Sequence, residues 1–349
     1  MSENIKFKID GNEYLAGKDE SIWDVAKKNN IDIPHLCYSP EPGYRADGNC
    51  RACMVEIKGE RTLAASCIRK PTEGMEVTVN SSRAEKSRSM VFELLVSDQP
   101  DKNVSPDPES KFWNWSDKLG VTDSRFPSKD KIELDRSHKA MSVNLDACIN
   151  CNLCVRACRE VQVNDVIGMA YRGSTAKVIF DLDDPMGNST CVACGECVQA
   201  CPTGALMEST VVNEEGHRDA YSDKVVESVC PYCGVGCQTE VHVKDEKILY
   251  VDGKNGPANE NRLCVKGRFG FEYINHDVRL TKPLVRKSGV NKDPNLEIKD
   301  ADIYDYFEET TWDDALSRAS AGFLNLKEDH GPKSLAGFGS AKCSNEEAY

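Results

Sequence analysis

Residues 148–160 read CINCNLCVRACRE, and this stretch places Cys148, Cys151, Cys154 and Cys158 within eleven residues. Four thiols this close together form either a disulfide framework or a set of metal ligands, and the cellular compartment decides between these two. The N-terminal segment MSENIKFKIDGNEYLAG has no apolar core, twin arginine or cleavage site, and no apolar run approaches the length of a membrane-spanning helix. We therefore expect a cytoplasmic chain with no membrane partner, whose clustered thiols stay reduced and bind metal.

The overall charge of the chain excludes one class of partner. Its 349 residues contain 44 Lys and Arg against 57 Asp and Glu, which gives a formal net charge of −13. An acidic balance of this size favours solubility and argues against binding to nucleic acid. The length suggests two or three domains, or more if they are small.

The 17 cysteines of the chain fall into four blocks of four, with Cys343 left over. The blocks are, in order, Cys37, Cys50, Cys53 and Cys67; Cys148, Cys151, Cys154 and Cys158; Cys191, Cys194, Cys197 and Cys201; and Cys230, Cys233, Cys237 and Cys264.

The second and third blocks share the spacing C-x2-C-x2-C-x3-C, which is typical of bacterial ferredoxins. In such paired runs three thiolates hold one [4Fe–4S] cluster and the fourth crosses to the other cluster. Two zinc sites are the alternative, but zinc favours separated pairs of ligands over three thiols in seven residues. The predicted ligand sets are Cys148, Cys151, Cys154 and Cys201 for one cluster, and Cys158, Cys191, Cys194 and Cys197 for the other.

The first block reads C-x12-C-x2-C-x13-C across a loop rich in glycine and small polar residues. Upstream, apolar residues alternate along 5–9, Asp10-Gly11 predicts a hairpin turn, and Ser21 with Asp24 predicts the start of a helix. Hairpin, helix and cysteine loop together are typical of β-grasp ferredoxins that hold a [2Fe–2S] cluster. The first gap is longer than the C-x4-C-x2-C of plant ferredoxins, and a zinc ribbon is the alternative.

Residues 68–147 contain no cysteine and a single histidine, His138. Residues 81–98 predict a helix with Met90, Val91, Leu94 and Leu95 on one face. We expect Trp113 and Trp115 to pack in a core rather than to touch a cofactor.

The fourth block reads C-x2-C-x3-C-x26-C, and residues 239–253 between its last two cysteines alternate as a hairpin around Asp245-Glu246. This arrangement resembles the N-terminal iron–sulfur domain of the molybdopterin oxidoreductases. The resemblance implies a third [4Fe–4S] cluster, held by Cys230, Cys233, Cys237 and Cys264.

The order of the blocks carries a closer resemblance, together with the stretches CPYCGVGCQTEVHVKD, ENRLCVKGRFG, RLTKPLVRK and GSAKCSNEEAY. The chain resembles the N-terminal part of the large subunit of cytoplasmic NAD-dependent formate dehydrogenases, and its first three blocks also resemble the large subunit of respiratory complex I. The implied fold is an α+β multi-domain iron–sulfur protein: a β-grasp [2Fe–2S] domain at 1–80, a helical linker at 81–139, a double [4Fe–4S] ferredoxin domain at 140–212, a small [4Fe–4S] β domain at 223–282, and the start of an α/β bis-pterin-binding catalytic domain at 283–349.

The resemblance also implies a function, oxidation of formate to carbon dioxide with electrons passing through one [2Fe–2S] and three [4Fe–4S] clusters towards a flavin- and NAD-binding partner subunit. The family uses a molybdenum or tungsten bis-pterin guanine dinucleotide. We do not expect this fragment alone to bind that cofactor, because the chain stops at Tyr349 before most of the pterin pocket; the remainder of the catalytic domain is therefore a further expected partner. No catalytic residue is expected within the chain. Many relatives hold an additional cluster through one histidine and three cysteines, and we expect it to be absent here, since residues 68–147 lack the cysteines.

Two further residues are singled out by the resemblance. Lys266 matches a family lysine between the cluster and the pterin, where a cation would relay electrons by favouring the reduced cluster; a solvated surface lysine is the alternative. Cys343 is expected to be a small buried residue rather than the ligand of molybdenum or tungsten. Arg262 and Arg268 are expected to flank the Lys266 region.

The C-terminal segment predicts a helix from Thr311 to about Lys327, ended by Gly331, with a strand at SLAGFG. Two other functions stay open, namely a purely electron-transferring subunit with no catalytic centre of its own and a zinc-dependent structural module.

Overall fold

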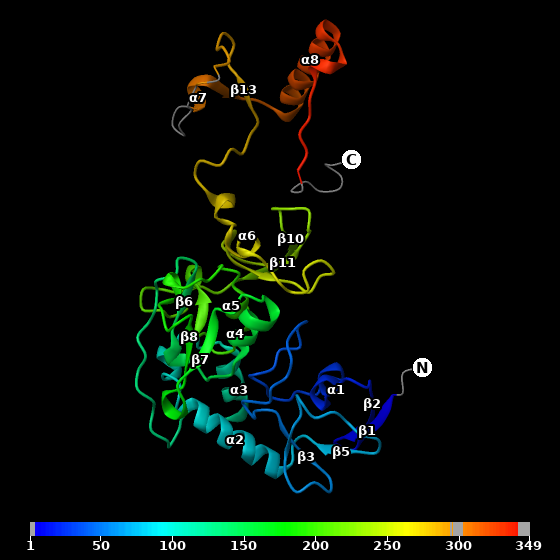
Figure 1. The fold of residues 1–349 in the computed structure, drawn as a ribbon, viewed down its shortest axis with the longest axis vertical. Helices are drawn as coiled ribbons and strands as arrows, with labels where there is room; N and C mark the ends of the chain where they lie inside the picture. The colour runs from blue at the N-terminus through cyan, green and yellow to red at the C-terminus, as the bar shows by residue number, and fades with distance from the viewer. Residues whose placement is uncertain (1–3, 294, 296–302, 341–349) are drawn as a thin grey trace. The chain divides into compact units, whose positions relative to one another are not determined.

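The computed structural model describes residues 4–293, 295 and 303–340. The chain forms two compact units, Met1–Pro231 with Val235–Phe269, and Tyr232–Gly234 with Gly270–Tyr349 (Figure 1). The predicted cysteine blocks lie in the first unit, apart from Cys233.

The first sheet is built from the N-terminal hairpin and the strands around the first cysteine block. Its strands run in the order β2-β1-β5-β3-β4, with β1 antiparallel to β2 and parallel to β5. Asp10 and Gly11 have φ of 48° and 83°, so the predicted hairpin turn is confirmed. The strands are β1 (Ile5–Ile9), β2 (Asn12–Ala16), β3 (Met54–Ile57), β4 (Ala64–Ala65) and β5 (Glu76–Thr78).

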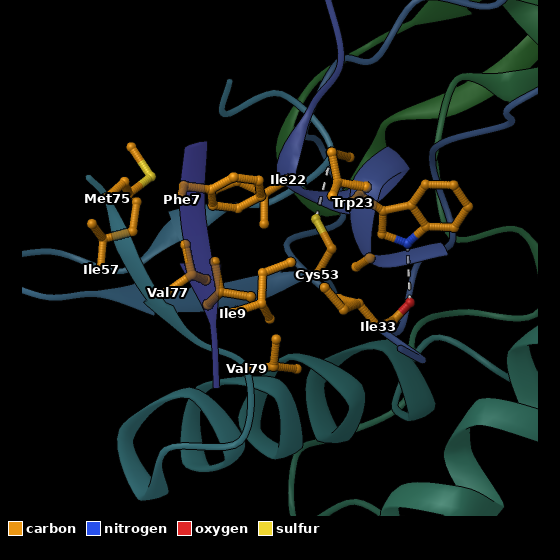
Figure 2. Packing of buried hydrophobic residues seen from close by; sticks show 14 of the residues in the cluster. Phe7, Ile9, Ile22, Trp23, Ile33, Cys53, Ile57, Met75, Val77 and Val79 are labelled. Carbon is orange, nitrogen blue, oxygen red and sulfur yellow. Dashed lines mark hydrogen bonds between the residues drawn. The ribbon is translucent and has the colours of Figure 1, made fainter. Parts of the chain in front are cut away.

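Helix α1 (Ile22–Lys28) begins at the predicted capping box, in which Ser21 and Asp24 each accept a hydrogen bond from the backbone N–H of the other. Its buried side chains join the core of the first sheet, and the Trp23 indole donates to the carbonyl of Ile33 at 3.1 Å. Figure 2 shows Cys53 within this core together with Ile9 and Val77. Two cysteines of the first block, Cys53 and Cys67, therefore lie against a packed apolar layer.

The next segment contains helices α2 (Ser82–Val96) and α3 (Lys111–Leu119). The predicted helix is confirmed as α2. Its buried residues are Ala84, Arg88, Phe92 and Val96, whereas Leu94, on the predicted apolar face, is exposed. The Arg88 guanidinium donates to the Met54 carbonyl at 3.1 Å and to Asn80 Oδ1 at 3.3 Å, which allows a charged residue on the inward face.

Helix α3 packs beside both the first and the second cysteine block. Trp113 is buried in a cluster that contains Cys37 and Cys151, and Trp115 is partly buried against it. The prediction that these tryptophans pack in a core is confirmed.

The second and third blocks occupy a segment with two short sheets and two short helices. Strands β6 and β9 pair antiparallel, as do β7 and β8. One core beneath them contains Cys154, Cys158 and Cys197. The elements are β6 (Met141–Val143), α4 (Leu153–Arg156) with a π-helical turn over Ala157–Val161, β7 (Ile167–Ala170), β8 (Lys177–Phe180), α5 (Glu196–Ala200) and β9 (Leu206–Glu208).

The fourth block surrounds a three-stranded antiparallel sheet of β10 (Lys224–Val229), β11 (Gln238–Lys244) and β12 (Lys247–Gly253). Asp245 and Glu246 have φ of 49° and 61°, so this hairpin is also confirmed. The chain then reaches the short helix α6 (Val265–Phe269), which directly follows Cys264.

The second unit contains a two-stranded sheet of β13 (Leu284–Arg286) and β14 (Phe307–Glu309), with helices α7 (Ile303–Tyr306) and α8 (Trp312–His330). Thr311 caps α8 by accepting from Asp314 N, and Gly331 follows the helix with φ of 79°, as predicted. The strand predicted at SLAGFG is wrong: Pro332–Ser334 form a 3-10 turn, and residues 335–340 have no regular structure. Gly331-Pro332 starts this turn, because proline fixes φ at a helical value. Cys343 lies outside the described residues.

Candidate iron–sulfur centres

The four cysteines of the first block come together in two close pairs. The Sγ atoms of Cys53 and Cys67 are 3.4 Å apart, and the N–H of Cys50 donates to Cys37 Sγ at 3.4 Å. The Cys67 thiol also interacts electrostatically with the other three. The hydrogen bond from Cys67 lowers the pKa of Cys53 to about 7, whereas the pKa of Cys67 itself is raised.

The last cysteine of each run interacts with cysteines of the other run. One cavity is lined by Cys148, Cys151, Cys154 and Cys201, and the Cys201 thiol acts electrostatically on each of the other three. The Cys158 thiol acts on three cysteines of the third block, Cys191, Cys194 and Cys197, and Cys201 also acts on Cys197. This grouping is compatible with the crossover pattern of paired ferredoxin runs.

The two runs also repeat an unusual backbone conformation. Asn150 and Ala193, each two residues after the first cysteine of its run, have φ of 53° and 55°. Each directs its N–H to that cysteine's sulfur, Cys148 or Cys191, at 3.4 Å. A left-handed alanine is strained, and such strain persists where the surroundings require the conformation. Here the conformation supplies a donor to sulfur, a contact that stabilises a thiolate.

Burial favours the neutral form of six thiols in the second and third blocks by raising their pKa. It raises the pKa of Cys148 to about 11 and also raises the pKa of Cys151, Cys154, Cys191, Cys194 and Cys197. No disulfide joins any of the twelve cysteines of the first three blocks. Grouped, buried and unbridged thiols with N–H donors to sulfur fit a metal–sulfur group, whose positive charge would deprotonate them.

The fourth block is gathered less closely. The N–H of Cys230 donates to the carbonyl of Cys237 at 2.9 Å, and a side chain at Gly267 of α6 would lie 3.4 Å from Cys230 Sγ. Helix α6, which directly follows Cys264, thus passes beside Cys230. Cys264 is exposed, and Cys233 is exposed and belongs to the second unit.

Lys266 lies on α6 and is exposed, whereas Arg268 on the same helix is fully buried. The Arg268 Nε donates to the Cys194 carbonyl at 3.2 Å, and Nη1 lies 2.7 Å from Asp252 Oδ1. Arg262 is partly buried and pairs with Glu260 at 3.4 Å. Arg268 therefore connects the fourth block to the third, a role that the sequence analysis did not assign.

Two other cations, buried Arg156 and partly buried Lys111, were not singled out from the sequence. Arg156, within the second run, donates to the carbonyl of Cys37 at 2.6 Å. Lys111 at the start of α3 has its pKa lowered to about 8 by burial, while the thiols of Cys50, Cys151 and Cys37 act in the opposite direction. The sequence could have drawn attention to Arg156, because it is a long charged side chain between two closely spaced ligands. Nothing in the sequence distinguishes Lys111 from other lysines.

The described residues contain neither a site for a single metal ion nor a helix that could span a membrane. Within 4–293, 295 and 303–340, no three His, Cys, Asp or Glu side chains are close enough to hold a single metal ion. An iron–sulfur cluster is a different case, because its core holds the ligand side chains further apart than a single ion does. None of the helices described is long and apolar enough to span a membrane.

Three segments of the chain match models of protein families. Residues 2–82 match a 2Fe-2S iron-sulfur cluster binding domain, 147–205 a 4Fe-4S dicluster domain, and 223–276 the molybdopterin oxidoreductase Fe4S4 domain. The chain carries three kinds of iron–sulfur domain. The expected [2Fe–2S] and [4Fe–4S] domain types are thus confirmed, in the expected order.

Curated relatives extend beyond this chain. "Probable oxidoreductase YjgC" of Bacillus subtilis is 30% identical over 381 residues, which is 98% of this chain and 37% of the relative. A protein named "Putative formate dehydrogenase" from Staphylococcus aureus is 30% identical over 391 residues, covering 100% of this chain and 37% of its own length. The chain therefore spans little more than a third of the curated relatives it matches.

Among solved structures, a chain of the NAD+-reducing [NiFe]-hydrogenase in its H2-reduced state is similar. The TM-score is 0.52 at 24% identity, over 59% of this chain and 87% of the hydrogenase chain. This likeness concerns the fold alone.

Proposed function

We propose that this chain is the electron-conducting part of an oxidoreductase of the formate dehydrogenase type. The observation that carries the proposal is the grouping of the cysteine thiols. The four thiols of the first block interact with one another, Cys201 lines a cavity with three cysteines of the second block, and the Cys158 thiol interacts with Cys197 of the third. This grouping supports the crossover that two-cluster ferredoxins require. The names of the curated relatives support the choice of formate as substrate class.

The proposed ligand sets follow from this grouping. When bound, the clusters would supply one-electron carriers with potentials set by cluster type, burial and hydrogen bonds to sulfur. Cys37, Cys50, Cys53 and Cys67 would hold a [2Fe–2S] cluster. The [4Fe–4S] sets would be Cys148, Cys151, Cys154 and Cys201; Cys158, Cys191, Cys194 and Cys197; and Cys230, Cys233, Cys237 and Cys264.

Interactions link each set to the next one along the chain, which supports a linear relay. The Cys37 thiol acts electrostatically on Cys151, and the Cys197 thiol acts on Cys154. The fourth set is joined to the third through Arg268 and the Cys194 carbonyl. The chain's own residues thus hold the first set next to the second, the second next to the third and the third next to the fourth.

Two partners complete the proposal. A flavin- and NAD-binding subunit would accept electrons from the first domain, and a molybdenum or tungsten bis-pterin domain would deliver them to the fourth. The hydrogenase likeness is compatible with the first partner, since the fold occurs in a protein named as NAD+-reducing. Lys266, exposed on α6 two residues after Cys264, is proposed to face the pterin side and to stabilise the reduced cluster.

The test is the metal content of the anaerobically purified chain. One [2Fe–2S] and three [4Fe–4S] clusters require about 14 iron atoms per chain, with matching acid-labile sulfide. Zinc in place of iron, or iron without sulfide, would exclude the proposal. A count near 18 would mean a further cluster in residues 68–147 and would overturn the expectation that this segment holds none.

A further inference from the structure

The two ferredoxin runs end in a repeated unit of five residues. Residues 154–158 read CVRAC and residues 197–201 read CVQAC, so Arg156 and Gln199 occupy the same position of the repeat. Arg156 is the last residue of α4, and Gln199 lies in α5. Each of the two side chains contacts a segment that lies outside the ferredoxin runs.

Arg156 joins the first block to the second. Its side chain is 2% exposed, and Nη2 donates to the carbonyl of Cys37 at 2.6 Å and to that of Cys151 at 3.4 Å. Nε lies 3.2 Å from Asp47 Oδ2, in the loop of the first block, and Nη1 donates to the carbonyl of Arg45. One guanidinium therefore holds backbone atoms of a predicted ligand from each of two clusters.

The chemistry of the guanidinium suits this role. Burying a charge is unfavourable unless it is paired and its donors are used, and here one carboxylate and four carbonyls, the fourth from Asn152, surround it. The group is planar with donors in a fixed fork, so it fixes the spacing of the carbonyls that it binds. A lysine in its place would keep the charge but not the fork.

Gln199 makes the corresponding contact on the other side of the repeat. Its Nε2 donates to the carbonyl of Gly253 at 3.0 Å, and the N–H of Gly253 donates to Oε1 at 3.1 Å. Gly253 ends β12, the strand that leads towards Cys264. A side chain at position 253 would collide with the backbone of Asn261, so only glycine permits these two backbone segments to lie this close together.

We propose that Arg156 and Gln199 are positioning residues, and that this repeated position docks the two flanking cluster segments onto the ferredoxin runs. The inference rests on the proposed function. Each residue would fix the distance for one electron-transfer step, Arg156 between the first and second blocks and Gln199 between the third and fourth. In each step one electron leaves the reduced site of one block and reduces the site of its neighbour. Since electron transfer slows steeply with distance, loosening either contact would slow one step without removing a ligand.

The test for Arg156 uses the whole chain, loaded with clusters anaerobically, as wild type, R156Q, R156K and R159Q. Arg159 is the matched control, since it lies in the next turn, is exposed and forms an ion pair with Asp165, away from the first block. Two readouts are followed beside the iron and sulfide content: the magnetic interaction between the first-block and second-block clusters in EPR spectra, and amide hydrogen exchange of residues 37–47.

For R156Q we expect unchanged iron content, loss of the magnetic interaction and exchange faster by about tenfold or more in residues 37–47. R156K should lie between R156Q and wild type, and R159Q should match wild type. A fully loaded R156Q with wild-type spectra and exchange would overturn the inference. If R156Q does not take up its clusters, R156K provides the test. A fully loaded R156K with wild-type spectra and wild-type exchange would also overturn the inference.

Gln199 gives an independent test. Q199L should speed exchange in residues 247–255 and weaken the interaction between the third-block and fourth-block clusters, while residues 37–47 behave as in wild type. Unchanged exchange in 247–255 would contradict the role of the repeated position. A wild-type chain that holds no iron–sulfur cluster would instead refute the proposed function, so the two failures are distinguishable.

Discussion

Glu196 Oε2 lies 3.5 Å from Arg268 Nη2, and both side chains are almost completely buried. Glu196 begins α5 in the third block, and Arg268 lies on α6 after the fourth. Tyr44, from the loop of the first block, donates its hydroxyl to Glu196 Oε1 at 2.9 Å. Three of the four cysteine blocks thus meet at one buried ion pair.

Removal of the arginine should therefore destabilise the first unit. R268M would leave Glu196 and Asp252 without their shared cation, and losing one partner of a buried pair costs about 3–5 kcal/mol. The measurement is anaerobic thermal or denaturant unfolding. K224M, which breaks the exposed pair between Lys224 and Glu246, is the control and should change the stability far less than R268M does, because solvent screens an exposed pair. The double variant E196Q/R268M should recover part of the loss; no recovery would mean that the pair is not coupled.

The crossover of the fourth thiolate predicts which cluster a cysteine variant damages. C158A should disrupt the cluster of the third block, because the Cys158 thiol faces Cys191, Cys194 and Cys197. C201A should do the same to the cluster of the second block. EPR and Mössbauer spectra of the two reduced variants would separate the clusters. Damage by C158A to the site of Cys148 would contradict the pairing.

Lys111 supplies a positive charge beside the thiols of the first two blocks, with Cys50 the strongest electrostatic partner among them. A nearby cation favours the more negative, reduced form of a cluster. K111M should therefore lower the midpoint potential of the first-block cluster by on the order of 60 mV, the equivalent of a tenfold change for a one-electron couple. A redox titration followed by EPR gives this value. K118M, on the exposed side of the same helix, should leave the potential unchanged; equal shifts in both variants would exclude a local effect of Lys111.

Glu208 should make stability depend on pH. Burial, together with the charge of Asp252, raises its pKa from 4.5 to about 7. A carboxyl with a raised pKa in the folded state is protonated there, so its favourable contribution is present below about pH 4.5 and is lost as pH rises through about 7. The full loss would be about 3 kcal/mol. Unfolding measured from about pH 4.5 to about pH 8 should show wild type losing more stability than E208Q, with most of the loss below about pH 7. Parallel pH profiles would contradict this role for Glu208.

Local sequence signals predicted the secondary structure best where one turn or cap decides it. The hairpins at Asp10-Gly11 and Asp245-Glu246 and the helix caps at Ser21 and Thr311 are all confirmed. Apolar periodicity could not reveal the burial of Arg88 on α2, because carbonyls brought close by the tertiary fold accept its hydrogen bonds. The strand expected at SLAGFG depended on a pairing partner, and pairing is a property of the tertiary fold rather than of the segment.

The number and spacing of the cysteine blocks can be read from the chain alone, since ligand spacing is a local constraint that a cluster core imposes. The same spacing predicts the exchange of Cys158 and Cys201 between the runs, which is a proposal for the bound clusters. The charges that lie among those blocks could be found only from the folded molecule. Arg156, Arg268 and Glu196 come from distant or unremarkable positions, and a charged side chain is stable when buried only where folding brings its partners to it.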